Sequence, residues 1–166
     1  MPVFKITKAG DPLLQSIAQP VTEFDSSLES LIQKLFDNFR YFHGVGIAAP
    51  QIGISKRVVV YGVKNNPRYP DAPFIEESIL INPEIIEYSE DKNEYFEGCL
   101  SLPNIRGMVP RANRIKYKTH TVTGKLVEKT AEGFEARIIQ HEIDHLNGLL
   151  YPMRMLDLST FKYTVN

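Results

Sequence analysis

Cysteine is nearly absent from this chain of 166 residues, in which Cys99 is the only one. A single cysteine excludes an internal disulfide and favours a reducing compartment. Charge of one sign is not in excess either, because 19 basic residues stand against 20 acidic ones. This balance leaves no electrostatic footprint for nucleic acid or for an anionic membrane surface.

Long hydrophobic runs are missing as well. No apolar stretch approaches the roughly 18–20 residues that a bilayer-spanning helix needs. The N-terminal residues 1–5 lack the pattern of a secretory signal and that of an Arg- and Ser-rich organellar presequence. We therefore expect a cytoplasmic protein, and an organellar location stays open if a presequence was removed.

The length and composition fit one globular domain spanning residues 1–166. Such a chain can bury one core but not two independent ones. A hydrophobic content of 43% and a charged content of 23% are ordinary for a globular protein. No internal repeat, low-complexity tract or linker divides the sequence.

Periodicity predicts two helices. Apolar residues recur with helical spacing from Asp25 to His43, where Asp25, Ser26 or Ser27 can cap the start and Gly44 can end the helix. The second helix runs from about residue 133 to 146 and ends at Asn147-Gly148. It is apolar on most of its circumference, so we expect it at the centre of the domain.

The predicted strands are short, and the predicted fold class is α+β. Three consecutive valines predict a buried strand over residues 57–63, and strand segments at 78–81 and 85–88 are interrupted at Asn82-Pro83. A hairpin is predicted over 114–127, turning near Thr123-Gly124, and three prolines predict a loop at 65–73. We expect these short antiparallel strands to pack around the central helix.

The central helix carries a His-Glu-x-x-His pattern. His141 and His145 are four residues apart, so both imidazoles lie on one helix face and can bind a single cation. Glu142 is then angled beside the metal, where it suits a general base acting on metal-bound water. The alternative is a pair of partly buried histidines on an amphipathic helix, and the rest of the sequence must decide.

A catalytic metal site needs three protein ligands and an open position. Downstream, Tyr151 stands where one class of metalloproteases has a third His, and no Glu follows Glu142. Asp157 is the remaining acidic candidate. Upstream, Cys99 is the stronger one, because a thiolate is a strong metal ligand and the preceding glycine allows close backbone approach.

Three separated motifs resemble those of the peptide deformylases. They are Gly44–Gln51 (GVGIAAPQ), Glu97–Ser101 (EGCLS) and Gln140–His145 (QHEIDH), and Asp11–Leu14 also resembles the family's N-terminal segment. The resemblance covers most of the chain. It implies one deformylase-like catalytic domain that removes the formyl group from the N-terminal formylmethionine of newly made proteins and releases formate.

The resemblance also implies the roles of individual residues. One ferrous ion (Fe²⁺) per chain, replaceable by zinc, nickel or cobalt, would be held by Cys99, His141 and His145. Glu142 would be the general acid and base. The negative charge on the formyl oxygen would be stabilised by the metal, the side-chain amide of Gln51 and the backbone N–H of Leu100.

Substrates would be nascent N-formylmethionyl peptides. Val45, Phe134 and Ile138 are expected to form an apolar pocket for the methionine, beside the bare backbone of Gly44 and Gly46. The peptide could pair as an added strand. The ribosome would be a transient partner, although the segment after residue 152 is too short for the long C-terminal helix of some family members.

Several alternatives stay open from the sequence. Arg106 either helps to position the peptide or is a solvated charge at a strand end, and the 65–73 loop either rims the cleft or covers an edge strand. A zinc endopeptidase would use His141, His145 and Asp157. A non-catalytic binding module would use Cys99 and the histidines only to hold its core.

Overall fold

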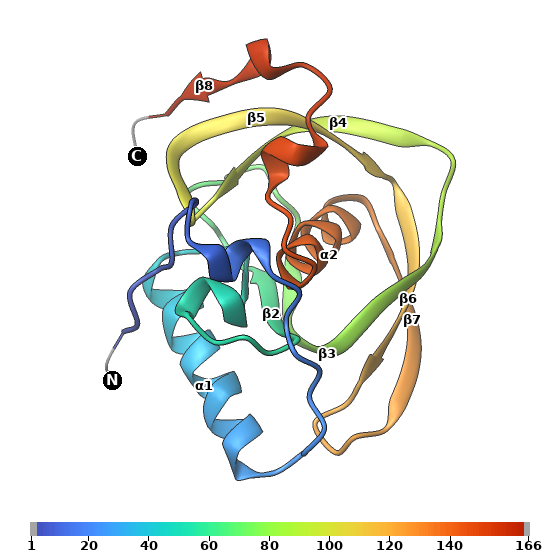
Figure 1. Cartoon of the computed structure of the whole chain (residues 1–166). Coiled ribbons are helices and arrows are strands. Elements are labelled where there is room, and N and C mark those ends of the chain that lie inside the picture. Colours follow the sequence, from blue (N-terminus) through green and yellow to red (C-terminus); the bar gives the residue numbers. More distant parts are fainter. Residues whose placement is uncertain (1–2, 165–166) are drawn as a thin grey trace.

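The computed structural model describes residues 3–164 and has an α+β architecture, as the sequence predicts (Figure 1). Its α-helices are α1 (Ser26–Tyr41) and α2 (Gly133–Leu146), and short 3-10 helices are η1 (Pro12–Gln15), η2 (Ala49–Ile52), η3 (Tyr151–Arg154) and η4 (Leu158–Thr160). Its strands are β1 (Gly46–Ala48), β2 (Val58–Val63), β3 (Ile75–Tyr88), β4 (Lys92–Cys99), β5 (Leu102–Ala112), β6 (Arg114–His120), β7 (Leu126–Glu132) and β8 (Lys162–Tyr163).

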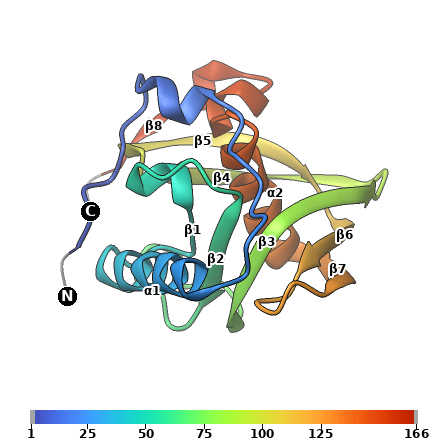
Figure 2. The same ribbon diagram turned by 60° about the horizontal axis from the view of Figure 1, so that its bottom comes forward.

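Two antiparallel sheets enclose α2. One sheet has the strand order β1-β2-β3-β6-β7, and the other has the order β4-β5-β8. Figure 1 shows α2 in the middle of the molecule, and Figure 2 shows α1 beside β1 and β2, away from α2. The predicted central position of the second helix is therefore confirmed. No helix within residues 3–164 is long and apolar enough to cross a membrane.

Strand β2 is buried on both faces, which explains its run of valines. Val59 and Tyr61 pack with α2 in one core cluster, while Val58 and Val60 pack with α1 in another. Successive side chains of a strand point to opposite faces, so a strand between two helices has no polar side. The same sheet thereby packs against α2 on one face and against α1 on the other.

The ends of both helices follow from local chemistry. The Asp25 side chain caps α1 by accepting hydrogen bonds from the backbone N–H groups of Ser27 (3.0 Å) and Leu28 (3.4 Å). Helix α2 ends just before Gly148, whose φ of +75° suits glycine. A Cβ on Gly148 would lie 2.7 Å from the carbonyl of Gln15, so this helix end also packs closely on the N-terminal segment.

One expectation about strands was wrong, and one hairpin was missed. Residues 75–88 form one strand instead of two segments, although Asn82 within it has a φ of +50°. The Asn82 side chain hydrogen-bonds both the N–H (2.8 Å) and the C=O (2.9 Å) of Val21. The β3–β6 pairing shifts register across this point, between Ile81 and Glu84, where β3 changes its partner from β2 to β6. The long β4–β5 hairpin was not predicted, since Pro103, Gly107 and Pro110 obscure its alternation.

Candidate metal centre and active site

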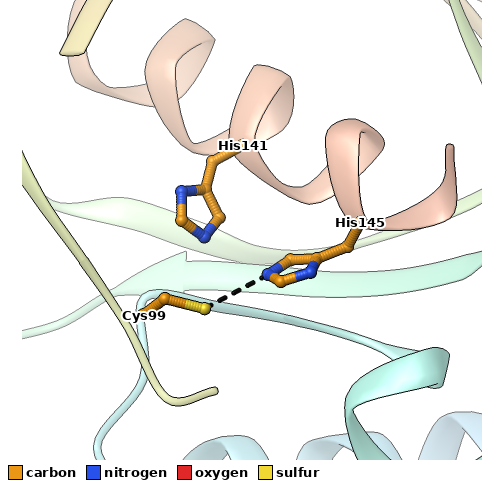
Figure 3. Close-up of side chains that lie close together, drawn as sticks. All are labelled: Cys99, His141 and His145. Atoms are coloured by element: carbon orange, nitrogen blue, oxygen red, sulfur yellow. Dashed lines mark hydrogen bonds between the residues drawn. The ribbon is translucent and has the colours of Figure 1, made fainter. Parts of the chain in front are cut away.

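The three predicted metal ligands lie together in the structure. Cys99 ends β4, while His141 and His145 stand on one face of α2, and their ligand atoms lie within 4.8 Å of one another (Figure 3). The Cys99 Sγ atom is 3.3 Å from His145 Nε2. All three residues are buried or nearly so. Helical spacing brings the imidazoles together, and the packing of β4 against α2 supplies the thiol.

Glu97 fixes the orientation of the first histidine. Its Oε1 atom is 2.8 Å from His141 Nδ1, which leaves Nε2 of that ring as the ligand atom. Burial raises the pKa of Glu97, but Arg111 and His141 outweigh it and hold the pKa well below its ordinary value. The carboxylate therefore stays ionised and accepts the His141 N–H.

Buried arginines anchor this carboxylate. Arg111 Nε donates to Glu97 Oε2 (2.9 Å) and its Nη2 to Oε1 (3.0 Å), while Arg137 Nη1 donates to Oε2 (2.6 Å). Arg111 also donates to Asp144 on α2 (2.6 Å). The charged groups are thus paired, as buried charges must be. Sequence reasoning assigned no role to these residues.

The electrostatics of Cys99 favour the form that binds metal. Burial raises the pKa of its thiol, but His145 and His141 outweigh burial and hold the pKa well below the ordinary value. A thiolate with two imidazoles fits a borderline-soft divalent cation such as ferrous iron or zinc. A fourth protein ligand is not among the clustered residues of the part of the chain that the structure describes. The donor set therefore corresponds to an open site.

Glu142 has the environment of an acid–base group. It is 3% exposed, and its Oε2 atom has no hydrogen-bond partner within residues 3–164. Burial raises its pKa, with His141 and His145 acting in the opposite direction. A buried carboxylate oxygen without a protein donor fits a place for a water molecule or a substrate proton.

Gly46 makes room for Glu142. A Cβ at this position would lie 2.6 Å from Glu142 Oε1 and 2.9 Å from its Cδ. Strand β1 therefore packs directly on the Glu142 carboxylate, and a side chain at this position would displace that group. The sequence analysis placed this glycine beside the methionine pocket and did not foresee the contact.

Gln51 and Leu100 flank the cysteine. Gln51 is 1% exposed, and its Oε1 atom accepts from the Ala48 N–H (2.9 Å). Its Nε2 therefore faces the Ser101 hydroxyl (3.2 Å) and Cys99 Sγ (3.6 Å). Leu100 follows Cys99 in the turn between β4 and β5. The side-chain amide of Gln51 and the backbone of Leu100 therefore both lie next to Cys99, one of the three candidate metal ligands.

A cleft opens onto these groups. The predicted substrate residues Gly44, Val45, Gly46, Phe134 and Ile138 line this cleft. The lining is mainly apolar near α2, as a pocket for an aliphatic or thioether side chain requires.

The 65–73 segment is a loop, as predicted, and it rims the cleft. Arg68 and Tyr69 line the opening, and the Asn66 amide donates to the carbonyls of His43 (2.9 Å) and Gly44 (3.2 Å). The loop is thereby attached to the first motif. Its proline content marked it as a loop, but the sequence held no signal for these contacts.

Two other candidate residues lie elsewhere. The Arg106 guanidinium lies 4.5 Å from the centre of the Tyr69 ring and donates to the Arg68 carbonyl (2.9 Å). Arg106 lines a second groove that adjoins the cleft at Arg68, and it does not line the cleft itself. Asp157 is exposed and caps η4 through Ser159. A metal site made by His141, His145 and Asp157 is therefore wrong.

Known proteins are similar to this chain in both sequence and fold. Peptide deformylase 1 of Nitrosomonas europaea is 47% identical over 160 residues, which cover 96% of this chain and 91% of the relative. Peptide deformylase 1 of Bordetella pertussis is 46% identical over 163 residues, covering 98% and 93%. A class I type b peptide deformylase from Acinetobacter baumannii, solved with Met-Ala-Ser bound, superposes with a TM-score of 0.89 at 44% identity, covering 93% of this chain and 99% of that one. The peptide deformylase from Thermotoga maritima has a TM-score of 0.85 at 39% identity, covering 95% and 100%.

The fold and the Cys-His-His centre define a metal-dependent hydrolase. The family model described as polypeptide deformylase matches residues 3–160. The chain belongs to the peptide deformylase family. It removes the N-formyl group from newly made peptides, so the interpretation as a non-catalytic binding module is wrong.

Proposed function

We propose that Glu142 carries the proton transfers of this deformylation and that Gln51 and Leu100 stabilise the negative charge that forms on the formyl oxygen. The observation that supports this proposal most directly is the buried, unpartnered Oε2 atom of Glu142 beside Cys99, His141 and His145. A carboxylate that lacks a protein donor is free to exchange protons with a reactant.

Glu142 acts first as a base and then as an acid. It accepts a proton from the water whose oxygen attacks the formyl carbon. It then donates that proton to the amine nitrogen as the carbon–nitrogen bond breaks, so that formate and a free N-terminus leave. A bound metal ion supplies a Lewis acid that polarises the formyl oxygen and lowers the pKa of water. The raised pKa of Glu142 brings the residue closer to the proton affinity that both transfers need.

Charge on the formyl oxygen grows only as water attacks. Gln51 Nε2 and the Leu100 backbone N–H are the proposed donors to this oxygen. Because Gln51 is held through its Oε1 atom by the Ala48 N–H, its amide group is oriented before substrate arrives. Preorganised donors of this kind lower the barrier without a cost of reorientation during the reaction.

The methionine side chain of the substrate occupies the cleft beside Val45, Phe134 and Ile138 in this proposal. An apolar, adaptable wall suits a flexible thioether. The Acinetobacter baumannii relative with Met-Ala-Ser bound supports a peptide that continues from the cleft, and in this proposal the peptide pairs as an added strand. Arg106 would act beyond the methionine, in the adjoining groove.

The metal we propose is Fe²⁺, with Zn²⁺, Ni²⁺ or Co²⁺ as substitutes. A zinc ion would bind the same donors more tightly, so the occupant depends on metal supply. We further propose a cytoplasmic enzyme that meets nascent chains as they leave the ribosome, with the ribosome as a transient partner. These points rest on the family resemblance.

The test is an anaerobic assay of formate release from formyl-Met-Ala with Fe²⁺-loaded protein. Glu142→Gln should keep one metal ion per chain and the wild-type melting temperature, yet lose about 10²–10⁴-fold or more in kcat, because an amide cannot shuttle protons. Wild-type turnover in the metal-loaded variant would contradict the assignment. Reloading with Ni²⁺ should give activity that survives air, whereas Fe²⁺ activity should decay.

A further inference from the structure

The N-terminal segment joins the two loops that carry the proposed charge-stabilising donors. The Thr7 N–H donates to the carbonyl of Gln51 (2.8 Å), and the Ala9 N–H donates to the carbonyl of Ser101 (2.9 Å). Figure 1 shows this segment, in dark blue, passing beside η2 and the β4–β5 turn. Two loops that are far apart in sequence are therefore linked by three consecutive residues.

Lys8 makes the third link, and it is the only one of the three made by a side chain. Its Nζ atom donates to the backbone carbonyl of Leu100 (2.9 Å). Leu100 and Ser101 are the two turn residues between Cys99, which ends β4, and Leu102, which begins β5. Their peptide groups lie outside the regular ladder, so contacts with other parts of the chain must limit their rotation.

We propose that Lys8 is a positioning residue for the site that stabilises the formyl oxyanion. Its ammonium group holds the Leu100 carbonyl, and the Thr7 and Ala9 N–H groups hold the flanking loops, so that the Gln51 amide and the Leu100 N–H keep a fixed separation. This inference rests on the proposed roles of Gln51 and Leu100.

The arrangement has a specific energetic consequence. The carbonyl and the N–H of Leu100 belong to the two peptide groups on either side of one α-carbon, so fixing one restricts the other. Loss of the Lys8 contact lets the Leu100 N–H move away from the oxyanion position. The neutral formyl oxygen of the substrate depends less on this donor than the transition state does, and the deformylated product lacks the oxygen altogether.

Lys8→Met keeps the aliphatic stem and removes the ammonium group. We expect a roughly 10-fold fall in kcat on formyl-Met-Ala, since small misplacements of catalytic donors are costly. KM, metal content and affinity for the product peptide Met-Ala-Ser should stay within about 2-fold of wild type, because these quantities do not involve an oxyanion. Lys8→Arg, which retains a charged donor, should recover most of the lost kcat. Lys5→Met, at another exposed lysine of the same segment, is the matched control and should leave every parameter unchanged.

The outcomes separate this inference from the function on which it rests. Unchanged kcat in Lys8→Met would overturn the inference, and so would a parallel loss of kcat, metal and product affinity, which would indicate general loosening. If Gln51→Leu alone leaves kcat intact, the oxyanion site itself is refuted, and the Lys8 inference is refuted with it. If Gln51→Leu lowers kcat, adding Lys8→Met to it should cost less than Lys8→Met costs alone, because both changes weaken one site.

Discussion

The substitution Gly46→Ala should lower kcat strongly while leaving the stability of the fold nearly unchanged. The added Cβ would lie 2.6 Å from Glu142 Oε1, so the carboxylate must withdraw by about 0.8 Å to restore an ordinary van der Waals separation. A displacement of about 1 Å in a catalytic group can cost on the order of 10²-fold in rate. We therefore expect kcat on formyl-Met-Ala to fall by about 10²-fold.

The stability of the same variant should change little. The obstructing atoms belong to a side chain that can rotate, at a cost of about 0.5–1.5 kcal/mol for an unfavourable rotamer. Gly46 does not have a positive φ, so alanine also stabilises by about 0.4–1 kcal/mol through the unfolded chain. The two effects nearly cancel, and the melting temperature of Gly46→Ala should lie within about 4 °C of wild type.

Gly62→Ala is the matched control on the adjacent strand. A Cβ there would lie 2.9 Å from the Cα of Glu77, and backbone cannot rotate away. Overpacking of this kind costs about 1–3 kcal/mol, which should lower the melting temperature by roughly 2–12 °C. Gly62 does not line the catalytic cleft, so kcat should be retained. Full kcat in Gly46→Ala, with the metal bound, would refute the claim that this glycine makes room for Glu142.

Four further substitutions test the metal centre and the residues around it. Cys99→Ser should bind metal weakly or not at all, since a serine hydroxyl ionises far less readily than a thiol, and Asp157→Asn should be neutral; metal analysis of both proteins checks this. Gln51→Leu should lower kcat by about 10²–10³-fold with little change in KM, as measured by steady-state kinetics, and a raised KM with intact kcat would mean that Gln51 only holds substrate. Glu97→Gln should weaken metal binding by about 10–100-fold in a chelator competition, because His141 loses its charged orienting partner, and unchanged affinity would contradict that role.

The parts of the structure that the sequence predicts are those governed by local rules. Helix α2 has the predicted limits because its apolar face, its histidine pair and the final Asn147-Gly148 all depend on neighbours within a few turns. The same rules locate α1 and β2. The cluster of three candidate metal ligands was also predictable, since two came from helical spacing and Cys99 was the single thiol in the chain.

The parts that were missed depend on contacts between distant segments. The strand β3 continues through Asn82-Pro83, where the Asn82 amide is satisfied by Val21, about 60 positions earlier. The contacts of Lys8 with Leu100, and of Asn66 with the Gly44 loop, likewise join segments that no local period relates. Sequence spacing carries no information about such pairs, because the fold alone brings them together.

The role of Glu97 depends partly on local spacing and partly on contacts between distant segments. Residues two apart on a regular strand share a face, and Glu97 and Cys99 are both buried at the end of β4 although the β4–β5 pairing shifts register between them. A buried ionised carboxylate needs hydrogen-bond donors and compensating positive charge, so a buried Glu97 calls for partners that the local sequence does not identify. Arg111 and Arg137 meet that requirement in the structure. The motif Glu-Gly-Cys therefore brings a candidate metal ligand and the acid that orients His141 to the same buried end of β4.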